Sequence, residues 1–204
     1  MKCPRCVQSI HHGADACPHC GFTLTELDSY FAGSEPVMQR LSDVAGAVRV
    51  KERKHLRTVF KEFEKIFPQL YFVVHVEQLE PEIDIQQYAF WLLNRGTVTD
   101  LARAKSSEGG TLLLIDVSGK ALTLSWGYLL DDFLNEEITF SILSKAHPFL
   151  LQGQYAKGIE VVLRSLMNTL RRSRAVQMVY EAGGEPVRKL APLTTKTEDE
   201  GAEA

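Results

Sequence analysis

The stretch that decides the fold, residues 111–126, reads TLLLIDVSGKALTLSW. Its first part is an apolar run of strand length, and in its second part Leu122, Leu124 and Trp126 share one face at alternate positions. Between the two parts lies the Ser-Gly pair at 118–119, which is a two-residue hairpin signal. We therefore expect two antiparallel strands at this point of the chain.

Two helices and a further strand are expected upstream of the hairpin. Residues 51–67 carry apolar side chains at helical spacing, and Pro68 marks the end of the pattern. Residues 70–76, LYFVVHV, form a β-rich run of strand length. Residues 84–95 return to helical spacing, and Gly96 follows them. Because a helix separates the strand at 70–76 from the hairpin, a parallel crossover is expected between them.

Two more helices are expected after the hairpin. One fits from about Glu136 to His147 and is stopped by Pro148, and a longer one runs from about Tyr155 to Val179. The expected order is helix, strand, helix, strand, strand, helix, helix. This order predicts an α/β fold in which a small mixed β-sheet is sandwiched by helices.

Composition places the chain among ordinary globular proteins. It has 204 residues, 45% apolar residues and a net charge of −3. No stretch approaches the ~20 apolar residues that a membrane-spanning helix needs, and the opening MKCPRC lacks the apolar core of a signal peptide. The charge offers no attraction for nucleic acid. We expect a cytoplasmic protein with no transmembrane segment and no strong signal for a nucleic-acid partner.

The chain divides by composition into four parts. Residues 1–22 hold all four cysteines and are called the cysteine module below. Residues 23–40 mix Gly, Ser, Pro and acidic residues, which is typical of a linker. Residues 41–180 carry the α/β pattern. Residues 183–204 end in TTKTEDEGAEA, which predicts a disordered acidic tail.

The cysteines predict a zinc ribbon. Cys3, Cys6, Cys17 and Cys20 form two Cys-x-x-Cys pairs with ten residues between them. Thiolates two residues apart on a tight turn can point at one ion, and two such turns close the tetrahedral four-sulfur site that zinc prefers. A closed shell of this kind is structural. About twenty residues build no core of their own, so the metal supplies the folding energy.

Two alternatives stay open for the cysteine module. The pairs could be redox dithiols, although single redox sites do not come in matched pairs. His11, His12 or His19 could also replace a cysteine as a ligand, but four thiolates already complete a tetrahedral shell. Lys2 and Arg5 alone make a poor basic patch for nucleic acid.

An ordered set of segments resembles the TPM domain family, which is named for a thylakoid-lumen protein, a photosystem II repair protein and a receptor modulator. The resemblance covers about residues 41–172, and Val44 replaces an aromatic residue of the family pattern. The matching segments are SDVAG (42–46), IDIQQYAFWLLNRG (83–96), EGGTLLLIDVSGKALTLSWGY (108–128) and HPFLLQGQYAKGI (147–159).

The resemblance implies a mixed α/β sandwich and two kinds of activity. Some relatives are described as metal-binding acid phosphatases. Others assist the assembly or repair of membrane complexes, or modulate a receptor, without clear chemistry. Many relatives are exported and membrane-anchored, and we expect neither feature in this chain.

The resemblance also singles out acidic residues. Glu108 stands where the family has Asp-Asn-Gly before the middle strand, and the acidic position of its Gly-Tyr-Gly-Leu-Glu turn falls on Asp131. The aspartate of its Leu-Thr-Asp corresponds best to Glu136, with Glu137 not excluded. Each position stays acidic, but Glu for Asp moves the charge by one methylene, which a rigid metal site would notice.

Glu108, Asp131, Asp132 and Glu136 are therefore the oxygen ligands expected for a second ion, Ca²⁺ or Mg²⁺. A phosphate ester is an anion, so carboxylates help its hydrolysis only by holding a bridging cation. The competing hypothesis is helix capping. Asp132 or Asn135 suits an N-cap, and acidic residues in the first turn complement the helix dipole.

The leading hypothesis is a cytosolic adaptor-like protein in which a zinc ribbon docks and a TPM-like domain binds a protein partner or ligand. The alternative is a divalent-metal-dependent acid phosphatase that uses the carboxylates. No catalytic residue is assigned, because no cysteine lies outside the ribbon and no glycine elbow surrounds a serine. His55, His75 and His147 are expected in structural or surface roles.

Overall fold

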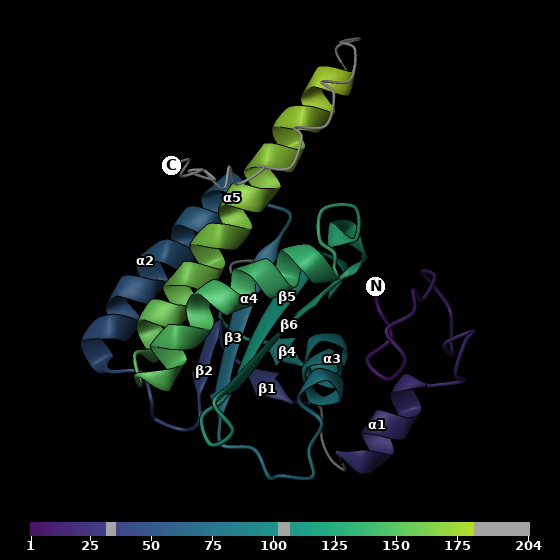
Figure 1. Ribbon diagram of the computed structural model, residues 1–204, viewed down its shortest axis with the longest axis horizontal. Helices are drawn as coiled ribbons and strands as arrows, with labels where there is room; N and C mark the ends of the chain where they lie inside the picture. Colours follow the sequence, from purple (N-terminus) through teal and green to yellow (C-terminus); the bar gives the residue numbers. More distant parts are fainter. Residues whose placement is uncertain (32–35, 102–106, 182–204) are drawn as a thin grey trace, which may run out of the picture.

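The computed structural model describes residues 1–31, 36–101 and 107–181, with backbone alone from residue 174 onward (Figure 1). The acidic tail predicted at 183–204 lies outside the described residues. The elements, in chain order, are α1 (Leu24–Tyr30), β1 (Val37–Met38), β2 (Leu41–Asp43), α2 (Val50–Ile66), β3 (Tyr71–Glu77), α3 (Ile85–Arg95), β4 (Thr97–Val98), η1 (Ser107–Gly109), β5 (Gly110–Asp116), β6 (Ala121–Trp126), η2 (Tyr128–Leu130), α4 (Glu136–Leu151) and α5 (Tyr155–Glu181).

A four-stranded mixed sheet forms the centre, in the order β2-β3-β5-β6. β3 lies parallel to β5 with Tyr71 opposite Gly110, and β5 lies antiparallel to β6 with Thr111 opposite Trp126. The predicted crossover and hairpin are thereby confirmed. β2 adds to β3 in parallel and was not predicted, because three residues are too few to show a period. β1 and β4 form a separate parallel pair.

Helices cover both faces of the central sheet, which confirms the α/β sandwich (Figure 1). One face of β5 presents Leu113 and Ile115 to a core built with α2, α4 and α5. The other face presents Leu112 and Leu114 to a core that includes α3, Leu27 of α1 and residues of the cysteine module. All four of these β5 side chains are fully buried. The cysteine module is therefore part of the second core.

The two predicted upstream helices form with the expected ends. α2 ends at Ile66, two residues before Pro68, because the residue ahead of a proline is pushed away from helical geometry. α3 begins after Asp84, whose carboxylate accepts hydrogen bonds from the amides of Gln86 and Gln87, each at 2.9 Å. Both helices bury the apolar stripe that the sequence indicates.

Two details of the predicted elements are corrected. Pro148 does not stop α4, which continues to Leu151. A proline this close to the C-terminus removes only one intrahelical bond, and the extra turn fully buries Leu150. The hairpin turn spans four residues, 117–120, and is not a two-residue turn. The Asp116 carboxylate accepts from the backbone amides at 118 and 119, at 3.0 and 2.8 Å, and so stabilises a longer turn.

The segment expected to be a linker, residues 23–40, contains regular structure. Helix α1 and strand β1 lie within it, and Leu27 and Met38 are buried. Thr23 caps α1 through a capping box with Glu26. Because α1 packs against α3, this part of the chain is a packed layer of the fold, and the expectation of an irregular linker is corrected for these residues.

Candidate functional site

The cysteine module is built from two similar turns. In the first, the amide of Cys3 donates to the carbonyl of Gln8 at 2.8 Å, and in the second the amide of Cys17 donates to Phe22 at 2.8 Å. Each turn also closes with a bond back to the carbonyl of its first cysteine, from Val7 at 3.0 Å and from Gly21 at 2.9 Å. The two Cys-x-x-Cys segments therefore present their side chains in the same way.

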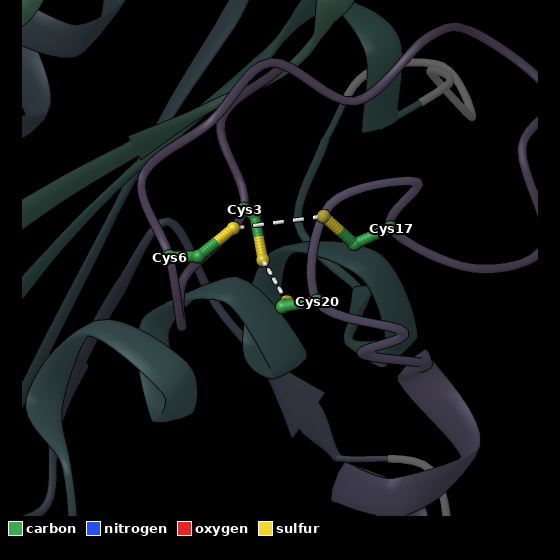
Figure 2. Close-up of side chains that lie close together, drawn as sticks. All are labelled: Cys3, Cys6, Cys17 and Cys20. Carbon is green, nitrogen blue, oxygen red and sulfur yellow. Dashed lines mark hydrogen bonds between the residues drawn. The ribbon is translucent and has the colours of Figure 1, made fainter.

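The four sulfur atoms converge on one point (Figure 2). The Sγ atoms of Cys3 and Cys20 are 3.7 Å apart, as are those of Cys6 and Cys17, and all four ligand atoms lie within 4.8 Å of one another. Four sulfurs bound at ~2.3 Å around a tetrahedral ion would be about 3.8 Å apart, whereas a disulfide would be about 2.0 Å. The geometry fits a four-sulfur metal centre.

The protein environment affects the two buried cysteines differently, because, although desolvation opposes the shift, hydrogen bonds from the amides of His19 and Cys20 help to lower the pKa of Cys17 to about 7. Cys3 and Cys17 are buried. Burial raises the pKa of the Cys3 thiol to about 12, with a smaller opposing contribution from nearby backbone amides. A thiol of this kind becomes a thiolate at neutral pH only when a metal ion compensates its charge.

The cysteine module packs onto the α/β domain. Its buried side chains belong to the same apolar cluster as α3. The rings of Phe22 and Phe90 meet edge to face with their centroids 5.8 Å apart, and the Arg5 guanidinium lies 5.0 Å above the Phe22 ring. The module residues in this cluster are Met1, Cys3, Ile10, Cys17 and Phe22.

Two of the four predicted carboxylates contact the cysteine module. Nε2 of His12 lies 2.5 Å from Oε1 of Glu108, and the amino group of Met1 contacts the Asp131 carboxylate. Trp126 donates its indole N–H to Asp131 at 3.0 Å. Tyr128, which lies between Glu108 and Asp131 in the sequence, donates a hydrogen bond from its hydroxyl to the carbonyl of His11 at 3.1 Å. We call η1, η2 and Asp131 the acidic corner, and the module contacts it through Met1, His11 and His12.

Close backbone packing brings the two acidic turns together. A Cβ atom at Gly127 would overlap the carbonyl oxygens of Ser107 and Glu108, so only glycine fits between η1 and η2. The amide of Gly127 also donates to Gly110 at 2.9 Å. This contact explains why glycine stands at position 127.

The other two carboxylates are placed differently. Asp132 and Glu136 are exposed, and Asn135 is the N-cap of α4, accepting from the amide of Ile138 at 2.9 Å. Glu136 and Glu137 then lie in the first turn of α4, as the capping hypothesis expects. Among the described residues, only the four cysteines form a group of three or more metal-binding side chains within reach of one ion.

Each of the three histidines outside the module contacts a polar group of the α/β domain. His75 is buried in β3, with Nε2 2.9 Å from Glu77, and His147 lies 3.1 Å from the carbonyl of Lys120. His55 lies 3.1 Å from Glu160. The hydrogen bond from His75 lowers the pKa of the Glu77 carboxyl, although partial burial opposes the shift. None of the three faces the acidic corner or the cysteines in these contacts.

One feature was missed by the sequence analysis. A groove of about 320 Å³ runs between the cysteine module, α3, β6 and α4. Its lining includes Val7, Phe90, Trp126 and Phe140, and we call it the edge groove. The available signal was Phe140, an aromatic residue on α4 that stays 75% exposed. Nothing in the sequence alone indicated that the module would form one of the walls.

Fold and site together define a class: a small mixed α/β sandwich joined to a four-cysteine metal centre. The model of the TPM domain matches residues 41–169, and the chain belongs to this family. None of the helices, over the described residues, is long and apolar enough to cross a membrane.

The solved structures that are similar to this chain share little sequence with it. One is the N-terminal domain of a protein from P. gingivalis, with 15% identity, a TM-score of 0.52, and coverage of 72% of this chain and 88% of that one. Another is the BA42 protein of Bizionia argentinensis, with 16% identity, a TM-score of 0.48, and coverage of 61% and 82%. The comparison with curated proteins found no match.

Proposed function

We propose that this chain is a cytosolic adaptor-like protein in which a structural zinc ribbon and the TPM domain act together to bind a protein partner. The observation that carries the proposal is the contact between ribbon and acidic corner. His12 and the Met1 amino group contact Glu108 and Asp131, the carboxylates that a metal-dependent hydrolase would need for its cation. A corner filled in this way favours binding over hydrolysis.

Zinc has a structural role in this proposal. Cys3, Cys6, Cys17 and Cys20 would hold the ion in a closed tetrahedral shell, with no open position for a substrate. The ion supplies the charge that keeps the buried Cys3 thiol deprotonated. The ribbon residues then hold the positions from which they contact α3 and the acidic corner.

The alternative is a phosphatase that binds Ca²⁺ or Mg²⁺ at the acidic corner. One observation favours it, which is that the turns bearing Glu108 and Asp131 pack against each other through Gly127. Hard cations take oxygen ligands, so the donor type is suitable. This activity requires the ribbon contacts to open first.

Hydrolysis of an aryl phosphate separates the two functions. Purified zinc-loaded protein is assayed with p-nitrophenyl phosphate in Ca²⁺, Mg²⁺ or Mn²⁺, beside the double variant Asp131→Asn/Glu136→Gln. If the protein is an adaptor, the wild type should hydrolyse the phosphate ester no faster than the double variant does. Divalent-dependent turnover that collapses in the variant would replace the proposal with the phosphatase function.

Partner binding is tested with surface variants. Deleting residues 1–22 would uncover the second core, so a clean test changes exposed positions instead. We expect a tagged protein to be cross-linked to the same partner in wild type and in Leu151→Ser, a matched control 58% exposed on α4 outside the groove lining. The partner should be lost in Val7→Asp and Phe140→Ser. Equal recovery by all variants contradicts the proposal.

A further inference from the structure

Strand β6 is an edge of the central sheet. It pairs with β5 and, among the described residues, with no other strand. Its sequence, ALTLSW, has no charged residue and no proline. Proteins usually protect an open edge with lysine, proline, a bulge or a covering segment. The absence of the first two from β6 makes its open side suitable for pairing with another strand.

The register shows which backbone groups are available. Gly127 donates its amide to Gly110, and hydrogen-bonded and non-bonded pairs alternate along an antiparallel ladder. The N–H and C=O groups of Leu122, Leu124 and Trp126 therefore point away from β5. Within the described part of the chain, no backbone bond joins them to another segment. These groups repeat every second residue, as the backbone of an extended strand requires.

The edge groove lies along part of this row of backbone groups, at Leu124 and Trp126, and Leu122 stands just beyond its lining. Its lining includes residues 123–126 of β6, with Phe90 of α3 on one side and Phe140 of α4 on the other. Val7 of the cysteine module, 43% exposed, also lines it. A single strand fits between such walls. A second copy of the protein would bring its own α3, α4 and module to the same place, so the walls disfavour edge-to-edge dimers.

One end of the groove carries an exposed carboxylate. Glu136 lines the groove and Asp132 is close to it in sequence, whereas Glu137 lines a separate pocket with Lys145 and Arg172. All three carboxylates are exposed, and none has a cationic partner among the described residues. Lys2 is the one basic side chain in the lining, and over the described residues it forms no ion pair with Glu136. This end of the groove therefore complements a lysine or an arginine.

We propose that the edge groove binds an extended segment of a partner protein as an additional strand on β6. The segment pairs through its main chain with Leu122, Leu124 and Trp126. It places apolar side chains on both sides, against Phe90 and Phe140, and a basic residue near Glu136. This mode of recognition takes its affinity from the backbone and its specificity from alternate side chains. The inference rests on the proposed adaptor function and names the chemistry of its partner.

A peptide library tests the proposal. Random ten-residue peptides displayed on phage are selected against the zinc-loaded full chain, and the enriched sequences are synthesised. We expect apolar residues at alternate positions with lysine or arginine at one end. Hydrogen exchange should show new protection of the amides of Leu122, Leu124 and Trp126 in the complex. N-methylation of the peptide at alternate amides should weaken binding by at least about tenfold, because each removes a main-chain bond.

Variants of the protein test each part of the site. Leu122→Pro removes an outward N–H and leaves the pairing with β5, and it should weaken binding by about tenfold. Phe140→Ser tests the wall without touching the sheet, and should weaken binding even if the proline variant fails to fold. Glu136→Gln should weaken binding to peptides that carry the basic residue, more strongly at low salt than at high salt. Leu151→Ser should bind as wild type.

Three outcomes overturn the inference. The first is a set of peptides that binds without protecting the β6 amides, which leaves the adaptor function standing and moves its site. The second is protection of the same amides by self-association, detected as a dimer by ultracentrifugation. The third is protection of these amides in the protein without any peptide, which disappears when the chain is ended at residue 181. That result makes the chain's own tail the occupant of the groove. A failure of the cross-linking experiment counts against the adaptor function itself, independently of these results.

Discussion

Val7 holds a backbone conformation that L-residues avoid. Its φ is 63°, and Gly21, at the equivalent position of the second cysteine turn, has a φ of 71°. The left-handed region costs an L-residue roughly 1–2 kcal/mol, and glycine avoids most of that cost. Asparagine tolerates the region better than valine. We expect Val7→Asn to raise the free energy of unfolding of the metal-loaded protein by about 1 kcal/mol, measured by urea denaturation.

Two further variants check this explanation. Val7→Ala removes the same apolar side chain but keeps an L-residue without asparagine's tolerance of positive φ. Its free energy of unfolding should therefore rise less than that of the asparagine variant. Gly21→Val introduces the unfavourable conformation at the second turn and should lower stability by about the same 1–2 kcal/mol. Equal stabilities of the alanine and asparagine variants would show that backbone conformation is not the cause.

At the residue scale, what could be predicted depends on distance along the chain. The clustering of the four cysteines was predictable because each pair is local and the spacing defines the chemistry. The family resemblance identified Glu108 and Asp131, but their partners lie 96 and 130 residues away in the sequence. No local pattern contains such a pairing, so the contacts of the acidic corner with the cysteine module were not predicted. The cation expected at this corner stays a prediction.

At the scale of elements, length and periodicity decided which ones could be predicted. α2, α3 and the β5–β6 hairpin carry enough residues for a clear period. α1 has seven residues and was missed, although Thr23-x-x-Glu26 is a capping box and was a usable signal. The short strands β1, β2 and β4 owe their pairing to neighbours that lie elsewhere in the chain.

The attachment of α1 to α3 is expected to depend on pH. Asp28 of α1 accepts hydrogen bonds from Arg95, at 2.6 and 2.9 Å, and from the Trp91 indole at 3.0 Å. The Arg95 bonds lower the pKa of Asp28 below its usual 3.8, with partial desolvation opposing. A lowered folded-state pKa means that the ionised carboxylate stabilises the fold above about pH 4 and that this stabilisation is lost as the pH falls further.

We therefore expect Asp28→Asn to be less stable than wild type at pH 7, and the difference to shrink at pH 3. The effect is modest because the Asp28 side chain is 35% exposed. Urea unfolding at both pH values measures it, and Trp91 fluorescence reports on the helix contact. Asp132→Asn makes the same charge change at an exposed carboxylate away from α1 and serves as the matched control. If the stability difference between wild type and Asp28→Asn were the same at pH 7 and pH 3, the ionised Asp28 carboxylate would not be the source of the stabilisation.

At the scale of the whole molecule, metal and domain are expected to be one cooperative unit. Structural zinc contributes about 10–16 kcal/mol of apparent binding energy in small modules, comparable to the total stability of a typical domain, about 5–15 kcal/mol. Because the module shares an apolar core with α3, removing the metal should lower the thermal midpoint of the domain by several degrees or more. It should also accelerate hydrogen exchange in α3.

Exchange on the opposite face provides the control. α2 and α5 pack in the other core, so their amides should be affected less than those of α3. Cys20→Ser removes an exposed ligand without a chelator and should reproduce the result. If α3 exchanges at the same rate with and without metal, the module is an independent unit and the shared core has no energetic importance.

The position of the module in the chain has a consequence for biosynthesis. A ribosome completes Cys20 well before Phe90, the ring against which Phe22 packs. During that interval the nascent module offers its thiolates to metal while Met1, Ile10 and Phe22 lack the surface that later covers them. The module can therefore bind its ion before it packs against α3. In a nascent chain that lacks zinc, α3 would form without an ordered module to pack against.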